Sequence, residues 1–216
     1  MRVLSWIWFN ALAQEGVART VTVLRQGATG QAEDEGLHIH KTTLSSPHPA
    51  GQVTPVEQEQ TRLPSPGEYL YEPSGAVVRA HLVQELAQEL GANLIDPHLA
   101  YLTAAEAVQS PLAQCYEVLE EIPVHEKQLK KWVRERGFTA LTIKKRGVDL
   151  VPEKLRATLL AGGAGKKSGK KTAKNQGYNP ATLVFTRGGS GQQARRIGWH
   201  VRSVDFSDAA HVSSSD

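Results

Sequence analysis

Helix-like and strand-like patterns alternate between residues 116 and 160, and this alternation constrains the fold more than any other feature of the sequence. The stretch "YEVLEEI" (116–122) alternates imperfectly and predicts a strand. The stretch "HEKQLKKWVRERG" (125–137) places its large apolar residues on one helical face and ends in glycine, so it predicts a helix. A strand over 138–143 and a helix over about 152–160 are predicted next. This order favours an α/β (α+β) fold.

Three adjacent cations, Lys144, Lys145 and Arg146, close the strand predicted over 138–143. Like charges this close repel one another and cost stability unless solvent or an anionic partner screens them. The triplet is therefore either a solvated turn or the place where an anion docks. Gly147 follows and suits a sharp turn, because glycine adopts a positive φ angle without steric penalty.

The formal net charge of +3 conceals a strong division along the sequence. Residues 1–126 carry 6 Lys/Arg and 16 Asp/Glu, residues 127–174 carry 15 and 3, and residues 175–216 carry 4 and 3. A basic block of this kind predicts an anionic partner, of which nucleic acid is the commonest. The alternative is a basic helix face that water alone solvates.

The first 66 residues predict little regular structure. Residues 17–25 alternate like one strand, whereas residues 26–66 are rich in Gly, Pro, Ser, Thr, Gln and Glu and predict an irregular linker. The opening "MRVLSWIWFNALA" imitates a signal peptide, but its apolar run is short. We interpret its aromatic residues as packing residues.

Regular structure is expected again after this linker. Residues 73–91 predict a helix, and "TLVFTR" (182–187) with "ARRIGWHVRSV" (194–204) predicts a hairpin. The Lys/Gly-rich segment at about 162–180 predicts a disordered loop. It is not a P-loop, because each Gly-Lys pair within it is followed by Lys instead of Ser or Thr.

The chain offers little for catalysis or metal binding. Cys115 is the only cysteine, so no intrachain disulfide can form, and we expect a small core residue in a protein of the reducing cytoplasm. Glu120 and Glu121 would point to opposite faces of a strand and would not act as a carboxylate pair. No apolar run approaches the roughly 20 residues that cross a bilayer. The histidines lack further ligands at suitable spacing, which leaves no expected metal or catalytic site at His38, His40, His48, His81, His98 or His125.

Several blocks of the sequence resemble a known family. In order they are "YLYEPSGAVVRAHLVQEL", "DPHLAYLT", "YEVLEEIPVHEKQLKKWVRERG", "LTIKKRGVDLVPEKL" and "ATLVFTR". Together they are similar to the THUMP-like C-terminal domain of bacterial, mainly actinobacterial, class I S-adenosylmethionine-dependent methyltransferases. The resemblance covers about residues 67–187. It implies a layered helix–strand domain with a mixed sheet over 67–206, preceded by the linker-like segment 1–66 and followed by a polar tail over 207–216.

THUMP domains in related enzymes bind RNA and present it to a separate catalytic domain. The resemblance therefore implies transfer RNA or ribosomal RNA as the partner, with no membrane partner and no DNA specificity. Point charges and an Arg fork would hold the phosphates without reading the bases. The cations expected to converge on these phosphates are Lys130, Lys131, Arg134 and Arg136 from the helix and Lys144, Lys145 and Arg146 from the strand end.

The same family implies a catalytic domain whose motifs are missing from this sequence. There is no glycine-rich turn after a first strand and no Asn-Pro-Pro-aromatic motif, since Asn179-Pro180 is followed by Ala and Thr. We expect a truncated module that is inactive alone and binds no cofactor, while a methyltransferase domain in cis or trans binds S-adenosylmethionine. The alternatives are an active methyltransferase and a protein-interaction or remnant domain without RNA affinity.

Overall fold

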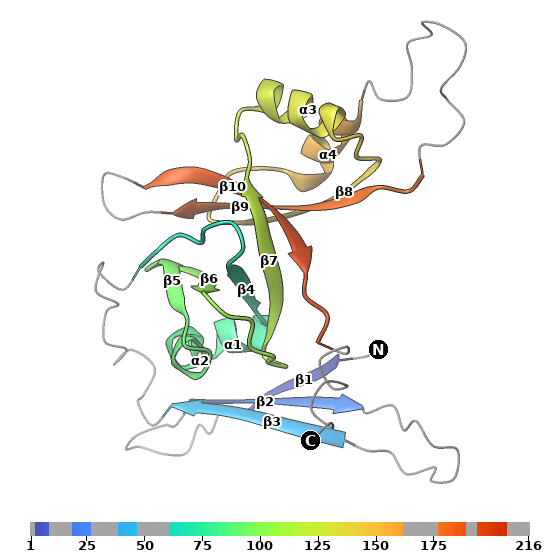
Figure 1. Ribbon diagram of the computed structural model, residues 1–216. Helices are drawn as coiled ribbons and strands as arrows, with labels where there is room; N and C mark the ends of the chain where they lie inside the picture. Colours follow the sequence, from blue (N-terminus) through green and yellow to red (C-terminus); the bar gives the residue numbers. More distant parts are fainter. Residues whose placement is uncertain are drawn as a thin grey trace, which may run out of the picture.

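Two sheets and four helices make up the described part of the chain (Figure 1). The structure is a computed structural model, and it describes residues 3–8, 19–26, 39–46, 61–161, 177–188 and 194–206. One sheet has three strands and the other has seven.

The seven-stranded sheet is mixed. Its spatial order is β5-β6-β4-β7-β10-β9-β8, with β8 and β9 parallel and the other neighbours antiparallel. Helices α3 (Glu126–Glu135) and α4 (Pro152–Leu160) follow β7 and β8, and α4 lies on the crossover that two parallel strands require. This arrangement confirms the predicted α/β (α+β) class with a mixed sheet. The strands are β4 (Tyr69–Pro73), β5 (Asn93–Asp96), β6 (Leu99–Ala104), β7 (Ala113–Glu121), β8 (Ala140–Arg146), β9 (Pro180–Gly188) and β10 (Arg195–Ser203).

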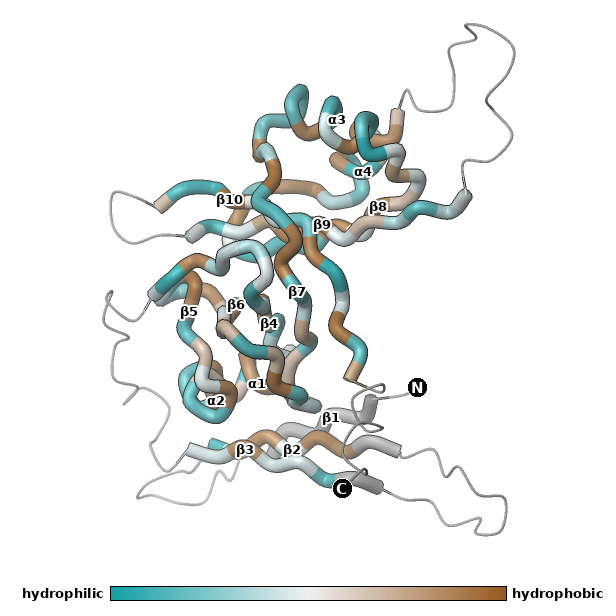
Figure 2. Tube along the Cα trace, viewed as in Figure 1, coloured by the Kyte–Doolittle hydropathy of each residue, from teal (hydrophilic) through white to brown (hydrophobic). Residues whose placement is uncertain are grey.

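Two pairs of helices cover one face of this sheet. Over β8 and β9, the buried residues Leu129, Trp132 and Val133 of α3 share a cluster with Ile143 and Phe185. Figure 2 shows the outer turns of α3 as hydrophilic, which is the complement of this buried stripe. Helices α1 (Gly75–Arg79) and α2 (Val83–Glu89) pack over β4 and β6 in a second cluster.

The opposite face of the sheet is concave and buries a core of its own. Tyr101, Tyr116 and Trp199 lie in this core, and each is at most 5% exposed. The sheet curves so far that strands which are not neighbours meet: Arg187 of β9 pairs with Asp96 of β5 at 3.0 Å. Strands β5 and β6 therefore fold back toward β8 and β9.

The N-terminal strands form a separate antiparallel sheet in the order β1-β2-β3. They are β1 (Val3–Trp8), β2 (Arg19–Gln26) and β3 (Ile39–Ser46). Val21 and Val23 of β2 belong to the same buried cluster as α1 and α2. Arg19 also donates a hydrogen bond to Glu85 of α2 at 2.9 Å, so this sheet is fastened to the helices by both apolar and ionic contacts.

This small sheet corrects one prediction. The strand over 17–25 is confirmed as β2, but the expectation of one strand followed by irregular chain up to residue 66 is wrong. Strand β3 turns Thr42, Leu44 and Ser46 toward the core side, and only one of the three is a large apolar residue. Its hydropathy therefore shows no period of two, and pairing with β2 specifies the strand instead.

Several predictions concern residues outside those described. They are most of the signal-peptide-like opening, the P-loop-like part of the Lys/Gly-rich segment at 162–180, the polar tail over 207–216, and His38 and His48.

The prediction of one helix over 73–91 is wrong, because two short helices form there. His81 ends α1 with a φ angle of 56°, in the left-handed position that glycine usually occupies after a helix. The N–H of Leu82 donates to the carbonyl of Val77 at 3.1 Å, which completes a Schellman motif. Gly91 ends α2 in the same conformation. A glycine in the sequence predicts such a helix end, whereas a histidine does not.

The remaining predicted elements are confirmed, and one irregularity is explained. The imperfect alternation over 116–122 comes from a bulge in β7: Val118 pairs with Val201 and Glu120 with His200. The confirmed elements are β7, α3, β8, α4 and the hairpin of β9 and β10.

We expect Gly147→Ala to destabilise the fold more than Gly137→Ala. Both glycines have positive φ angles, 68° and 65°, which cost other residues roughly 1–2 kcal/mol. A Cβ at Gly147 would also lie 2.5 Å from Cδ1 of Leu99, whereas nothing lies within 4 Å of one at Gly137. Urea unfolding should show that the free energy of unfolding falls by about 3 kcal/mol in Gly147→Ala and by about 1 kcal/mol in Gly137→Ala. Equal losses would contradict the close contact between β6 and the turn after β8.

Candidate nucleic-acid interface

The cation triplet lies on β8, and the strand divides it between two faces. Lys145 is exposed on the same face as Leu141 and Ile143, which is the face that α3 and α4 cover. Lys144 and Arg146 are on the opposite, concave face, where each is half-buried. Successive side chains of a strand alternate, so three adjacent residues of β8 do not share one face.

Glu72 of β4 is the anionic partner of the two inward cations. Its carboxylate lies 2.6 Å from Nζ of Lys144 and 4.0 Å from the guanidinium of Arg146. The two cations also lie over aromatic rings, 5.4 Å from the ring centre of Tyr116 and 5.3 Å from that of Tyr101. Lys144 and Arg146 therefore join β8 to the middle of the sheet across its concave face.

The pKa values on this face follow from burial and from the acid. Burial opposes the charge of Lys144, but its hydrogen bonds to Glu72 and Tyr116 outweigh burial and raise its pKa above 10.5. Burial raises the pKa of Tyr101 to about 12. At physiological pH Lys144 is thus charged, so it can pair with Glu72, and Tyr101 is neutral.

The structure does not bring the seven predicted cations together. Lys144 and Arg146 are on the concave face, whereas the helix that carries Lys130, Lys131 and Arg134 covers the opposite face. Only Lys145 shares a face of the sheet with that helix. Whether each of these residues binds RNA stays a prediction, but they do not form a single patch.

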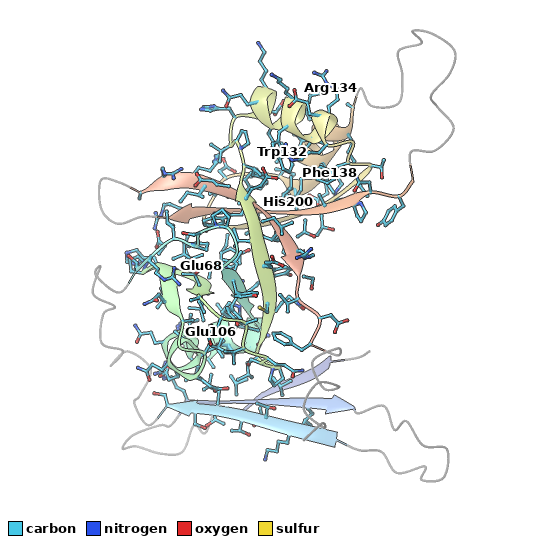
Figure 3. All side chains as sticks on the ribbon, in the orientation of Figure 1. Glu68, Glu106, Trp132, Arg134, Phe138 and His200 are labelled. Atoms are coloured by element: carbon cyan, nitrogen blue, oxygen red, sulfur yellow. The ribbon has the colours of Figure 1, made fainter. Side chains whose placement is uncertain are left out.

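The outward face of α3 carries a row of cations. Leu129, Trp132 and Val133 face the sheet, and the helix turns four cations away from it: Lys127, Lys130, Lys131 and Arg134. Lys131 lies 3.7 Å from Glu135 in an exposed pair one turn apart. The other three have no acidic partner within 4.0 Å among the described residues. Figure 3 shows Arg134 on the side of α3 away from the sheet.

Arg136, the residue that ends α3, is engaged differently. Its guanidinium lies 2.6 Å from a carboxylate oxygen of Glu120 and 4.4 Å from the ring centre of Trp132. The Trp132 indole N–H donates to the same oxygen at 3.3 Å. Sequence reasoning identified Arg136 as a cation but missed this cluster. Glu120 comes from β7, and His200, which also contacts Glu120, comes from β10, far away in the sequence.

The cysteine and the two glutamates considered for catalysis are either buried in the core or paired with arginine. Cys115 is confirmed as a core residue, 3% exposed, and burial raises its pKa to about 11. Glu120 and Glu121 do have different partners, since Glu121 pairs with Arg195 at 2.9 Å. Among the described residues no group of three or more His, Cys, Asp or Glu side chains is placed to hold a metal ion. None of the described helices has the length and apolar character needed to span a membrane.

A family comparison finds a match for the C-terminal sheet strands and the two helices between them. The family model described as THUMP domain-like matches residues 113–203. Residues 113–203 are therefore similar to the domains of this family, and we refer to them as the THUMP-like domain. The THUMP-like domain begins at the first residue of β7 and ends at the last residue of β10, so it contains α3, β8, α4 and β9 as well. Strands β4, β5 and β6 lie outside the matched residues but extend the same sheet.

Two curated proteins that are similar to this chain are named as methyltransferases. Over 185 residues the chain is 26% identical to an uncharacterized S-adenosylmethionine-dependent methyltransferase of Mycobacterium tuberculosis, in strains CDC 1551 / Oshkosh and H37Rv. The match covers 86% of this chain and 41% of the relative, so the chain spans about two fifths of the length of the curated relatives it matches. A crystal structure from Porphyromonas gingivalis W83, described provisionally as a methyltransferase, aligns over 84% of this chain and 38% of its own, with 19% identity and a TM-score of 0.47.

We expect Glu72→Gln to destabilise the fold, because it leaves Lys144 and Arg146 half-buried without a carboxylate. A hydrogen bond to a charged group contributes about 2 kcal/mol, and urea unfolding should show a loss of this size. The matched control is Glu117→Gln, which removes an exposed pair with Arg202 and should cost below about 1 kcal/mol. A loss at Glu72 no larger than at Glu117 would show that the ionic contact does not hold β8.

Acid is expected to destabilise the fold through His200. Burial lowers the pKa of its imidazole below 6.5, although Glu120, 3.6 Å away, acts in the opposite direction. The folded state therefore binds fewer protons, and the stability that neutral His200 contributes is full above about pH 6.5 and falls as the pH drops through the lowered pKa.

The measurement is the free energy of unfolding of wild type and His200→Gln at pH values on both sides of 6.5. The advantage of the wild type should shrink toward acid, because only the wild type has to charge a half-buried imidazole. His125→Gln, at an exposed position, is the control. A difference that is constant with pH would contradict the assignment.

Proposed function

We propose that this chain is an RNA-recognition module that serves an S-adenosylmethionine-dependent RNA methyltransferase. The THUMP-like domain and the methyltransferase relatives support this assignment. The observation that carries it is the outward face of α3, because three of its four cations, Lys127, Lys130 and Arg134, have no acidic partner within 4.0 Å among the described residues. The partner is transfer RNA or ribosomal RNA, and the setting is the cytoplasm.

The spacing on α3 suits a nucleic-acid backbone. Lys127, Lys130, Lys131 and Arg134 recur at intervals of three and four residues, so they lie along one side of the helix. At a rise of 1.5 Å per residue, they extend over roughly 10 Å. Double-stranded nucleic acid carries about one charge per 1.7 Å of axis, so several phosphates lie within reach of such a stripe. Such contacts supply affinity and position but no sequence specificity.

The inward cations have a different role in this proposal. Lys144 and Arg146 stabilise the curved sheet through Glu72, so their removal is expected to affect folding before binding. Lys145 is exposed on the face of the sheet that α3 and α4 cover, and it is retained as a phosphate contact. Residues 67–206 act as one unit, because the strands before the THUMP-like domain complete its sheet.

S-adenosylmethionine belongs to the catalytic partner in this proposal. Among the described residues no strand leads through a glycine-rich turn into a helix, which is the element that binds such cofactors. The described residues therefore do not fit the cofactor, and methyl transfer falls to a catalytic domain in cis or trans.

The test compares two variants with the same change in charge. The first replaces Lys127, Lys130, Lys131 and Arg134 by Gln, and the control replaces four exposed cations elsewhere: Lys41, Arg79, Lys154 and Arg202. Binding to transfer RNA is measured over a series of salt concentrations. Each lost phosphate contact lowers the slope of log K against log salt by about 1, so the α3 variant should lose about 3 to 4 and the control less than about 1.

Equal slopes for the α3 variant and the wild type would contradict the α3 interface. Binding of the wild type that does not depend on salt would contradict RNA recognition itself and favour a protein-interaction domain. Lys145→Gln in the same assay tests the remaining cation of the strand end.

A further inference from the structure

A flat cation is stacked on an aromatic ring at the C-terminal end of α3. The guanidinium carbon of Arg136 lies 4.4 Å from the ring centre of Trp132. Trp132 is 7% exposed, whereas the Arg136 side chain is 38% exposed. The guanidinium thus lies over the indole, and part of the Arg136 side chain remains accessible.

This stack is held in place by its neighbours. One oxygen of Glu120 accepts hydrogen bonds from Arg136 at 2.6 Å and from the Trp132 indole at 3.3 Å. The side-chain amide of Asn179 donates to the carbonyls of Arg136 and Gly137, each at 3.2 Å, and so secures the end of the helix. An arginine that is already oriented loses little side-chain entropy when a ligand stacks on it.

Two further rings support the indole. Phe138 and His200 lie 5.3 Å and 5.5 Å from Trp132, centre to centre, and 5.2 Å from each other. Figure 3 shows Trp132, Phe138 and His200 between α3 and the sheet, while Arg134 is on the outer side of the helix. Arg136 therefore covers the accessible edge of the aromatic cluster under α3, at the C-terminal end of the helix that carries the cations.

We propose that the Arg136–Trp132 stack is a platform for an unpaired RNA base. The proposal rests on the RNA-recognition function and adds that the RNA has at least one base free of a partner at this position. Unpaired bases stack on guanidinium planes and aromatic rings, and a base in a duplex has no free face for such a contact. The phosphates next to the base would lie along the cations of α3. Because every base has a flat face, the platform selects single-stranded structure and tolerates any sequence.

The decisive variant is Arg136→Lys, which keeps the charge and the ion pair with Glu120 but removes the plane. Arg202→Lys is the matched control, since it makes the same change at an exposed arginine that also has a carboxylate partner, Glu117, but lies outside α3. Affinity is measured for a short unstructured RNA and for a duplex of the same length. We expect Arg136→Lys to weaken binding of the single strand about tenfold and leave duplex binding unchanged, while Arg202→Lys changes neither.

A second measurement needs no substitution in the protein. Replacing the bases of the single-stranded RNA by abasic sites should weaken binding to the wild type by a similar factor, because the phosphates remain and the stack is lost. This result also decides the case if Arg136→Lys does not fold.

The platform is overturned if abasic and normal strands bind equally, or if a folded Arg136→Lys binds single strands as the wild type does. It is also overturned if that variant weakens single strand and duplex equally, since charge alone would then explain the effect. These outcomes leave the α3 interface intact. If the wild type binds neither RNA in a salt-dependent way, the proposed function fails and the platform fails with it.

Discussion

Glu72 is the acid on which the arrangement of the seven-stranded sheet depends. It comes from β4, near the middle of the sheet, and contacts Lys144 at 2.6 Å and Arg146 at 4.0 Å on β8, the edge strand. Two cations on one side of a strand repel each other, and placing them over Tyr101 and Tyr116 would cost more still without the carboxylate. The contact holds β8 across the concave face. Because α3 leads directly into β8, this contact also holds α3 over the opposite face of the sheet.

The same constraint separates the cations that stabilise the fold from those that are available to a ligand. Lys144 already has a carboxylate partner in Glu72, as Arg136 has in Glu120. A phosphate has to compete with an acid at such a position, whereas at Lys130 or Arg134 it displaces only water. Apart from Lys145, the proposed phosphate contacts therefore lie on α3 and not at the strand end where cations are densest in the sequence. Arg136 contributes a surface for stacking instead of a free charge.

Where the local pattern was strong, the sequence predicted the fold well. Leu129 and Trp132 specified the buried stripe of α3, and Gly137 specified its end. The prediction failed where the signal was tertiary: β3 pairs with β2 although its inward residues are mostly polar, and α1 ends at His81 in a conformation typical of glycine. The site divides in the same way. The cations of α3 could be placed from helical periodicity, but the partners of Lys144 and Arg136 could not, because these partners come from other strands.

By itself, the sequence determined which segments become helix or strand in the THUMP-like domain, and that this domain is basic. Those properties depend on side-chain periodicity, on the backbone freedom of glycine and on composition, all of which are local. Only the tertiary structure decided which charges remain free. Glu72 and Lys144 are 72 residues apart and meet only because the sheet curves back on itself. An ion pair of this kind depends on distance in space, and no local pattern encodes that distance.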